Sequence, residues 1–133
     1  MSSAGGPSDR EEGLSFQPRY DGDGLIPAIV TEENTGRVLM FAYMNAEALA
    51  LTLETGFAHF WTRSRKKLWQ KGEESGNRLR VTTARTDCDQ DVVWLTAVVE
   101  GNGVACHTAR KSCFYRRIVR APDGTLSLEF AEP

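Results

Sequence analysis

The chain has 133 residues, 41% of them hydrophobic and 26% charged, and its formal net charge is -2. This length suits one domain with a core of its own, and a slightly acidic chain lacks the basic surface that general binding to nucleic acids or membranes requires. The three cysteines are an odd number and no signal peptide or membrane-length apolar run is found, so we expect a soluble cytoplasmic protein with reduced thiols.

The predicted elements describe a β-rich α+β domain. Residues 1–12 contain no aromatic or β-branched side chain, which predicts a disordered tail before a single catalytic domain over residues 13–133. One main helix is predicted over residues 46–55, between the N-cap Asn45 and Gly56. About seven strands are predicted from apolar runs between turn residues: 25–30, 37–43, 57–62, 79–83, 92–99, 114–120 and 126–130.

Three carboxylates and a thiol stand together at residues 87–91, Asp87-Cys88-Asp89-Gln90-Asp91. If this segment is extended, its three carboxylates face one side and Cys88 the other. Oxygen ligands suit magnesium, whereas a thiolate suits zinc. An EF-hand is excluded because Val92 stands where its glycine belongs. A solvated acidic turn is the alternative interpretation, and only partners elsewhere in the chain decide between the two.

The first of two long polar connections, residues 63–77, combines cations, hydroxyls and glycines around one tryptophan. Such groups bind phosphates through charge and hydrogen bonds, and the indole ring can stack on a base. The alternative is a solvated charged loop with its tryptophan in the core. The candidate substrate-binding residues in this connection are Arg63, Ser64, Arg65, Trp69, Lys71, Glu73 and Ser75.

The second connection, residues 101–113, brings two thiols and an imidazole into one loop. Cys106 and Cys113, together with Cys88, can form a three-thiolate zinc site whose fourth position is left for water. We prefer His107 as a general base beside the metal, since it directly follows Cys106. The spacing of the cysteines is no established zinc motif, so three unrelated thiols stay the alternative.

Four motifs follow one another in the chain: residues 39–45; Thr62-Arg63-Ser64-Arg65 with Leu68-Trp69 and Lys71-Gly72-Glu73; residues 87–91; and Cys106-His107-Thr108 with Ser112-Cys113-Phe114. Together they resemble the phosphoribosyl-AMP cyclohydrolase family of histidine biosynthesis. The resemblance spans residues 25–114. Three places depart from the usual family residues, namely Ala109, Asn77 and Phe60-Trp61, and none of them is a predicted metal ligand.

The resemblance implies a mixed, curved sheet or pseudobarrel in an intertwined homodimer. It implies one zinc ion per subunit across the dimer interface, with Cys88 from one subunit and Cys106 and Cys113 from the other. It further implies magnesium at Asp87, Asp89 and Asp91, and a catalytic role for His107. Because the chain stops at Pro133 without a pyrophosphohydrolase domain, we expect a monofunctional enzyme.

The predicted reaction is hydrolytic opening of the N1–C6 bond in the adenine ring of N1-(5-phosphoribosyl)-AMP, which gives the phosphoribosyl-formimino aminoimidazole carboxamide ribotide. Zinc-activated water attacks C6, and His107 acts first as general base and then as general acid. The signature of zinc deaminases, which attack the same carbon, is missing from the chain. A non-catalytic, zinc-stapled nucleotide-binding module is the alternative.

Overall fold

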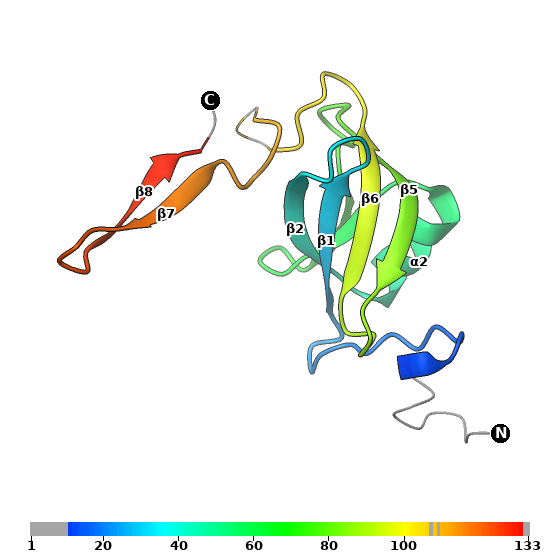
Figure 1. Ribbon diagram of the computed structural model, residues 1–133. Coiled ribbons are helices and arrows are strands. Elements are labelled where there is room, and N and C mark those ends of the chain that lie inside the picture. Colours follow the sequence, from blue (N-terminus) through cyan, green and yellow to red (C-terminus); the bar gives the residue numbers. More distant parts are fainter. Residues whose placement is uncertain (1–10, 107, 109, 132–133) are drawn as a thin grey trace.

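The computed structural model describes residues 11–106, 108 and 110–131 (Figure 1). Its elements are β1 (Ile26–Glu32), β2 (Val38–Met44), α2 (Ala46–Thr55), β3 (His59–Thr62), β4 (Lys67–Gln70), β5 (Leu79–Thr86), β6 (Val93–Val99), β7 (Arg116–Arg120) and β8 (Leu126–Phe130). Residues 1–10 of the predicted tail lie outside the described residues. Within the described part, no helix has the length and apolar character needed to cross a bilayer.

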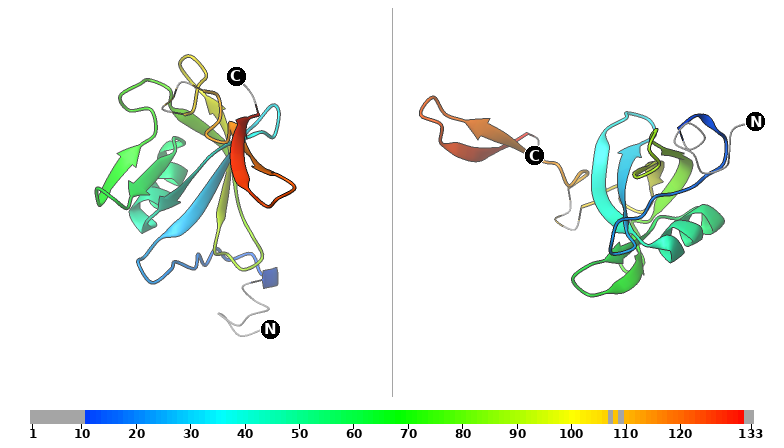
Figure 2. Two further views of the ribbon diagram at one scale, coloured as in Figure 1. Left: turned by 90° about the vertical axis from the view of Figure 1, so that its left-hand side faces the viewer. Right: turned by 90° about the horizontal axis from the view of Figure 1, so that it is seen from below.

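Six strands form one mixed sheet in the order β4-β3-β2-β1-β6-β5. All neighbours are antiparallel except β1 and β6, which run parallel. Phe57, just before β3, bridges to Arg80 of β5, so the sheet curls toward itself as a half-barrel (Figures 1 and 2). The predicted β-rich α+β fold with a curved, mixed sheet is therefore confirmed.

Helix α2 has the predicted bounds because Asn45 caps its N-terminus and Gly56 caps its C-terminus. The Ala48 amide donates to Oδ1 of Asn45 at 2.8 Å, and Gly56 takes the left-handed conformation with φ 81°. The helix buries Ala48, Leu49 and Thr52 against β3 and β2. These residues join a core of alternate strand residues on the concave side of the sheet, among them Ile26, Ala28, Val30, Leu95 and Ala97.

The structure contains one strand more than predicted. Strand β4 lies inside the first polar connection and forms an antiparallel hairpin with β3. Its only apolar residues are Leu68 and Trp69, which stand between Lys67 and Gln70, too few for a pattern of alternation. The pairing is stabilised by burial of Phe60 on β3, whose ring lies 5.4 Å from that of Trp69.

Strands β7 and β8 form a separate two-stranded hairpin, here called the arm. The arm extends away from the half-barrel (Figure 1 and Figure 2, right). Its apolar side chains are largely exposed: Ile118 by 75%, Leu126 by 68% and Phe130 by 63%. An isolated hairpin with so much exposed apolar surface is marginally stable in water. At its base the guanidinium of Arg110 lies over the rings of Tyr115 and Phe130, at 4.2 and 5.2 Å.

Candidate functional site

The three predicted carboxylates do converge, although the segment that carries them is not extended. Residues 88–90 form a turn between β5 and β6. The Gln90 amide donates to the Asp87 carbonyl at 3.1 Å, and Gln90 has a positive φ of 56°. The oxygens of Asp87, Asp89 and Asp91 lie within 4.8 Å of one another. Of the two interpretations, the acidic turn is therefore the one that forms, and the turn itself gathers the carboxylates.

Gln90 anchors this turn to the preceding segment of the chain. Its side chain is buried and accepts a hydrogen bond from the Gln17 amide at 2.6 Å while donating to the Ser15 carbonyl at 3.3 Å. Its carbonyl accepts from the Arg19 amide at 2.7 Å. Because the interior of the turn is fixed in this way, the three carboxylates point to solvent as a group. Sequence reasoning missed this role, since glutamine carries no signal for a left-handed backbone.

The carboxylates of this turn repel one another. The pKa of Asp91 is raised above its usual value, chiefly because its carboxyl group shares a hydrogen bond with Asp87, with smaller contributions from desolvation and from the charges of Asp87 and Asp89. All three groups are exposed, so an ion from solution can reach them. Three convergent carboxylate oxygens fit a hard divalent cation, which would relieve the repulsion. The donor set by itself does not identify the metal.

Cys106 and Cys113 lie side by side in the second connection. The Cys113 amide donates to the Leu39 carbonyl of β2 at 2.7 Å, and the hydroxyl of Ser112 donates to the Val38 carbonyl at 2.6 Å. The Cys106 sulfur is buried and accepts a hydrogen bond from the Thr108 hydroxyl at 3.0 Å. Two neighbouring thiols held by backbone bonds to β2 suit a thiophilic metal such as zinc.

The two thiols have unequal acidity. Burial by itself raises the pKa of Cys106, but hydrogen bonds from Thr108 and Cys113 and the charge of Lys71 outweigh it, so the net pKa is lowered. The pKa of Cys113 is raised to about 11, mainly by desolvation and then by its hydrogen bond to Cys106. The thiol of Cys113 therefore keeps its proton and donates a hydrogen bond to the sulfur of Cys106. The charge of Lys71 lowers the pKa of both thiols.

Cys88 lies far from this pair. It stands in the turn before β6, whereas the loop with Cys106 and Cys113 follows β6, a strand of seven residues that spans about 20 Å. Figure 1 shows that turn and that loop at opposite ends of the sheet. Among the described residues the three sulfurs do not form a cluster at ligand distance. The predicted base His107 lies outside the described residues, as does Ala109.

A cavity of about 490 Å³ opens beside the β3–β4 hairpin. Six of the seven predicted substrate-binding residues line it: Ser64, Arg65, Trp69, Lys71, Glu73 and Ser75. The seventh, Arg63, instead lies over the Tyr43 ring at 4.1 Å and lines a separate cavity with Trp61 and Lys66. Thr62, Lys67 and Gln70 also line the larger cavity. Lys67 and Gln70 were not predicted as lining residues because they belong to strand β4, which the sequence pattern did not indicate.

Two residues, Trp69 and Gly72, hold the wall of the large cavity in place. Trp69 packs on the fully buried Phe60, and the ammonium group of Lys71 lies 6.0 Å from the centre of the indole ring. Gly72 turns the chain with φ 86°. Lys71 lines this cavity, and its charge also lowers the pKa of Cys106 and Cys113.

Replacing Gly72 by alanine is expected to destabilise the protein strongly and to distort this cavity. A Cβ atom at this position would lie 2.4 Å from the backbone of Asn77 and Arg78, so the cost exceeds the ~1–2 kcal/mol of a left-handed backbone alone. Gly76→Ala is the matched control, since Gly76 has a similar φ of 82° but nothing within 4 Å of an added Cβ. Thermal unfolding of both variants would test the difference, and equal losses would contradict the packing argument.

Comparison with known proteins shows which family this chain resembles. The family model described as phosphoribosyl-AMP cyclohydrolase matches residues 40–115. A phosphoribosyl-AMP cyclohydrolase of Brucella anthropi is 58% identical over 125 residues, which is 92% of this chain and 88% of the relative. The namesake from Brucella abortus is 57% identical over 128 residues, covering 94% and 91%, and that from Sinorhizobium medicae is 59% identical over 111 residues, covering 84% and 74%.

Proposed function

The chain belongs to the phosphoribosyl-AMP cyclohydrolase family of hydrolases, and from this membership we propose the chemistry that its residues perform. The substrate is N1-(5-phosphoribosyl)-AMP, whose N1–C6 bond is opened by water in the cytoplasm as a step of histidine biosynthesis. The observation that carries the proposal is the cavity that is lined by six of the seven predicted substrate-binding residues. One of them, Lys71, also lowers the pKa of Cys106 and Cys113 through its charge.

In this proposal the large cavity holds the phosphorylated nucleotide. Arg65 and Lys71 provide cations for its phosphates, and the hydroxyls of Ser64 and Ser75 provide further hydrogen bonds. The exposed face of Trp69 offers a surface on which the base can stack, since the other face packs on Phe60. The Oε1 atom of Glu73 accepts a hydrogen bond from the Gln70 amide at 3.4 Å. This bond stabilises the turn after β4, and the carboxylate partly neutralises the positive charge of Arg65 and Lys71 in the cavity.

Cys88, Cys106 and Cys113 would hold zinc, and Asp87, Asp89 and Asp91 would hold magnesium. Bound zinc supplies a water nucleophile at neutral pH. We propose that His107 accepts the proton that leaves this water as the water oxygen bonds to C6. His107 would then return this proton to N1 as the N1–C6 bond breaks. The second proton of the water passes from the oxygen to the exocyclic nitrogen, so that C6 ends as a carboxamide carbonyl carbon and no net proton is consumed.

The same proposal requires a homodimer, because one chain does not bring its three thiols together. The exposed arm is the segment best suited to reach a second copy. A row of side chains crosses the outer face of the sheet in register, from Phe41 through Ile29 to Trp94, and a cavity of about 300 Å³ connects this row with Asp87. An arm seated on this row would bring the thiol pair of one copy toward Cys88 of the other.

The metal content and turnover of the purified protein test this proposal. We expect about one zinc ion per chain by elemental analysis. The ultraviolet change as N1-phosphoribosyl-AMP is consumed should require magnesium and should stop when a chelator removes the zinc. Bound zinc and bound nucleotide without turnover would instead indicate a non-catalytic, zinc-stapled binding module, and protein without zinc would contradict the thiolate site.

Replacing Arg65 by alanine is expected to raise KM about tenfold or more with a smaller change in kcat, because a charge-assisted hydrogen bond to a phosphate is lost. The control is Lys66→Asn. Lys66 adjoins Arg65 but lines the separate cavity with Arg63, and asparagine tolerates its left-handed φ of 52°. Steady-state kinetics of both variants would make the comparison. An unchanged KM for Arg65→Ala would remove this residue from the phosphate site.

A further inference from the structure

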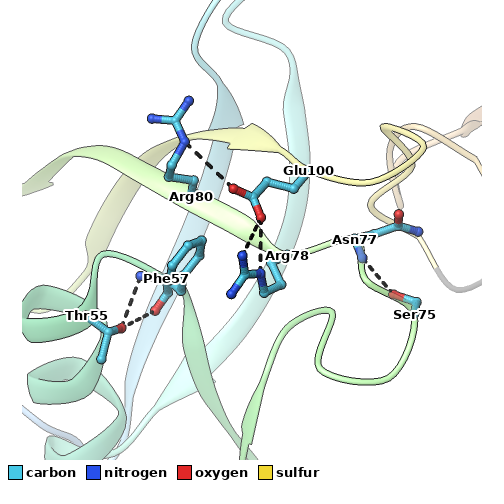
Figure 3. A network of polar contacts seen from close by, with 7 residues as sticks. All are labelled: Thr55, Phe57, Ser75, Asn77, Arg78, Arg80 and Glu100. Atoms are coloured by element: carbon cyan, nitrogen blue, oxygen red, sulfur yellow. Dashed lines mark hydrogen bonds and ion pairs between the residues drawn. The ribbon is translucent and has the colours of Figure 1, made fainter.

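One buried amide stands between the cavity loop and the loop that carries the thiol pair. Asn77 is 9% exposed. Its Oδ1 accepts a hydrogen bond from the backbone amide of Asn102 at 3.0 Å, and its backbone amide donates to the Ser75 hydroxyl at 3.2 Å (Figure 3). Ser75 lines the large cavity, while Asn102 opens the segment that leads to Cys106. A single residue therefore joins the two parts of the proposed site.

Close packing prevents Asn77 from changing position. A Cβ atom on Gly101 would lie 2.2 Å from Oδ1 of Asn77, and one on Gly72 would lie 2.5 Å from the Asn77 carbonyl oxygen. Both glycines have positive φ angles, 75° and 86°, so the chain approaches Asn77 from two sides with backbone alone. No other side chain fits between these loops and Asn77 at these two points.

The strand ends on both sides of this contact are also fixed. The Glu100 amide donates to the Arg78 carbonyl at 2.8 Å, and the side chains of the two residues form an ion pair at 2.9 Å. Arg78 also lies over the Phe57 ring at 4.0 Å. Figure 3 shows this group directly beside Asn77. The residues before and after the contact are thus held in register, and the Asn77 side chain fixes the point at which the 101–106 segment leaves the sheet.

We propose that Asn77 is a positioning residue that fixes the thiol loop relative to the substrate cavity, so that metal retention and substrate affinity depend on the same side chain. The proposal rests on the proposed function for its substrate and its zinc. The hydrogen bond between Asn77 and Asn102, on which the proposal is built, does not depend on the identity of the substrate or of the metal. Without the Oδ1 acceptor, the Asn102 amide loses its protein partner, and the 101–106 segment is no longer held at Asn77.

Asn77→Ala and Asn77→Asp provide the test, since aspartate keeps an acceptor oxygen in the same place. In Asn77→Ala we expect zinc affinity, measured by competition with a chromogenic chelator, to fall about tenfold or more, as for other residues that orient metal ligands. KM should rise several-fold at the same time. Alkylation of the buried Cys106 in metal-free protein, followed by mass spectrometry, should become several-fold faster. Asn77→Asp should stay closer to the unmodified chain in all three measurements.

The control is Thr52→Val, which removes another buried hydrogen-bonding side chain. Thr52 accepts from the His59 amide at 2.8 Å and donates to the Ala48 carbonyl at 2.8 Å, away from both loops. It should lower the unfolding temperature without changing zinc affinity, KM or Cys106 alkylation. If Asn77→Ala behaves like Thr52→Val, the positioning role is wrong. Should Asn77→Ala fail to fold, Asn77→Ser, with a shorter acceptor, is judged by the same measurements.

The alkylation rate separates this inference from the proposed function. It is measured without metal or substrate, so it reports only how well Asn77 holds the 101–106 segment. A chain that shows no turnover, but in which Asn77→Ala accelerates Cys106 alkylation, would contradict the proposed function and support the positioning role. Turnover with an alkylation rate that Asn77→Ala leaves unchanged would have the opposite meaning.

Discussion

Mixing the Cys88→Ser variant with the Cys106→Ser variant is expected to restore activity that neither variant has alone. Each homodimer lacks a zinc ligand at both of its sites. In the proposed dimer, Cys88 and Cys106 of each site come from different subunits, so a mixed dimer would contain one site with two substituted ligands and one site with none. With random exchange in an equal mixture, about a quarter of all sites are intact, so about a quarter of the unmodified activity should return.

The physical basis of this expectation is the separation of the thiols within one chain. Cys88 lies in the turn before β6, and Cys106 and Cys113 follow that strand, about 20 Å away along it. A zinc ion needs sulfur ligands at about 2.3 Å. A rearrangement that joins the three thiols within one chain would have to break the β5–β6 pairing, which extends from Leu79 to Thr86.

The control pairs two ligands from the same loop. Mixing Cys106→Ser with Cys113→Ser should restore no activity, since every site of the mixed dimer still lacks one of these two sulfurs. The mixtures are refolded together and compared by zinc content and by turnover. If both pairs behave alike, or if Cys88→Ser alone retains zinc and activity, the shared site is wrong.

Replacing Asp89 by asparagine is expected to raise the magnesium concentration needed for half-maximal activity by about tenfold or more, because one of three charged ligands is lost. Asp89 is the best choice of the three. Asp87 accepts hydrogen bonds that shape the turn, and the pKa of Asp91 already depends on Asp87. Asparagine at position 89 removes the charge with little change in side-chain volume.

Titration calorimetry with magnesium alone complements the activity measurement, because it reports binding without substrate. Asp23→Asn is the control, since Asp23 is an exposed acidic residue outside this turn and its change alters the net charge of the protein equally. The triad would lose its role if Asp89→Asn and Asp23→Asn had the same small effect on magnesium binding. Equal loss in both would indicate that only the overall charge matters.

Local sequence signals predicted the elements whose causes are local. Helix α2 has its predicted bounds because Asn45 and Gly56 provide the two caps within the segment itself. Strand β4 was missed because its stability comes from Trp69 packing on Phe60, which is a contact across strands. The turn at residues 88–90 was one of two interpretations left open by the sequence. Its anchoring was missed because Gln90 is held in a left-handed conformation by Gln17 and Ser15, more than seventy positions away.

The sequence by itself determined the chemistry available to this protein: three thiols, three clustered carboxylates and a cation-rich connection, in an order that resembles one family. Only the tertiary structure decided which of these groups meet. The parallel pairing of β1 with β6 and the curl of the sheet place Cys88 apart from Cys106 and Cys113. They also gather six predicted substrate-binding residues around one cavity and place Asn77 between the two loops. Such neighbours depend on strand order and on packing between distant segments, which spacing along the chain does not encode.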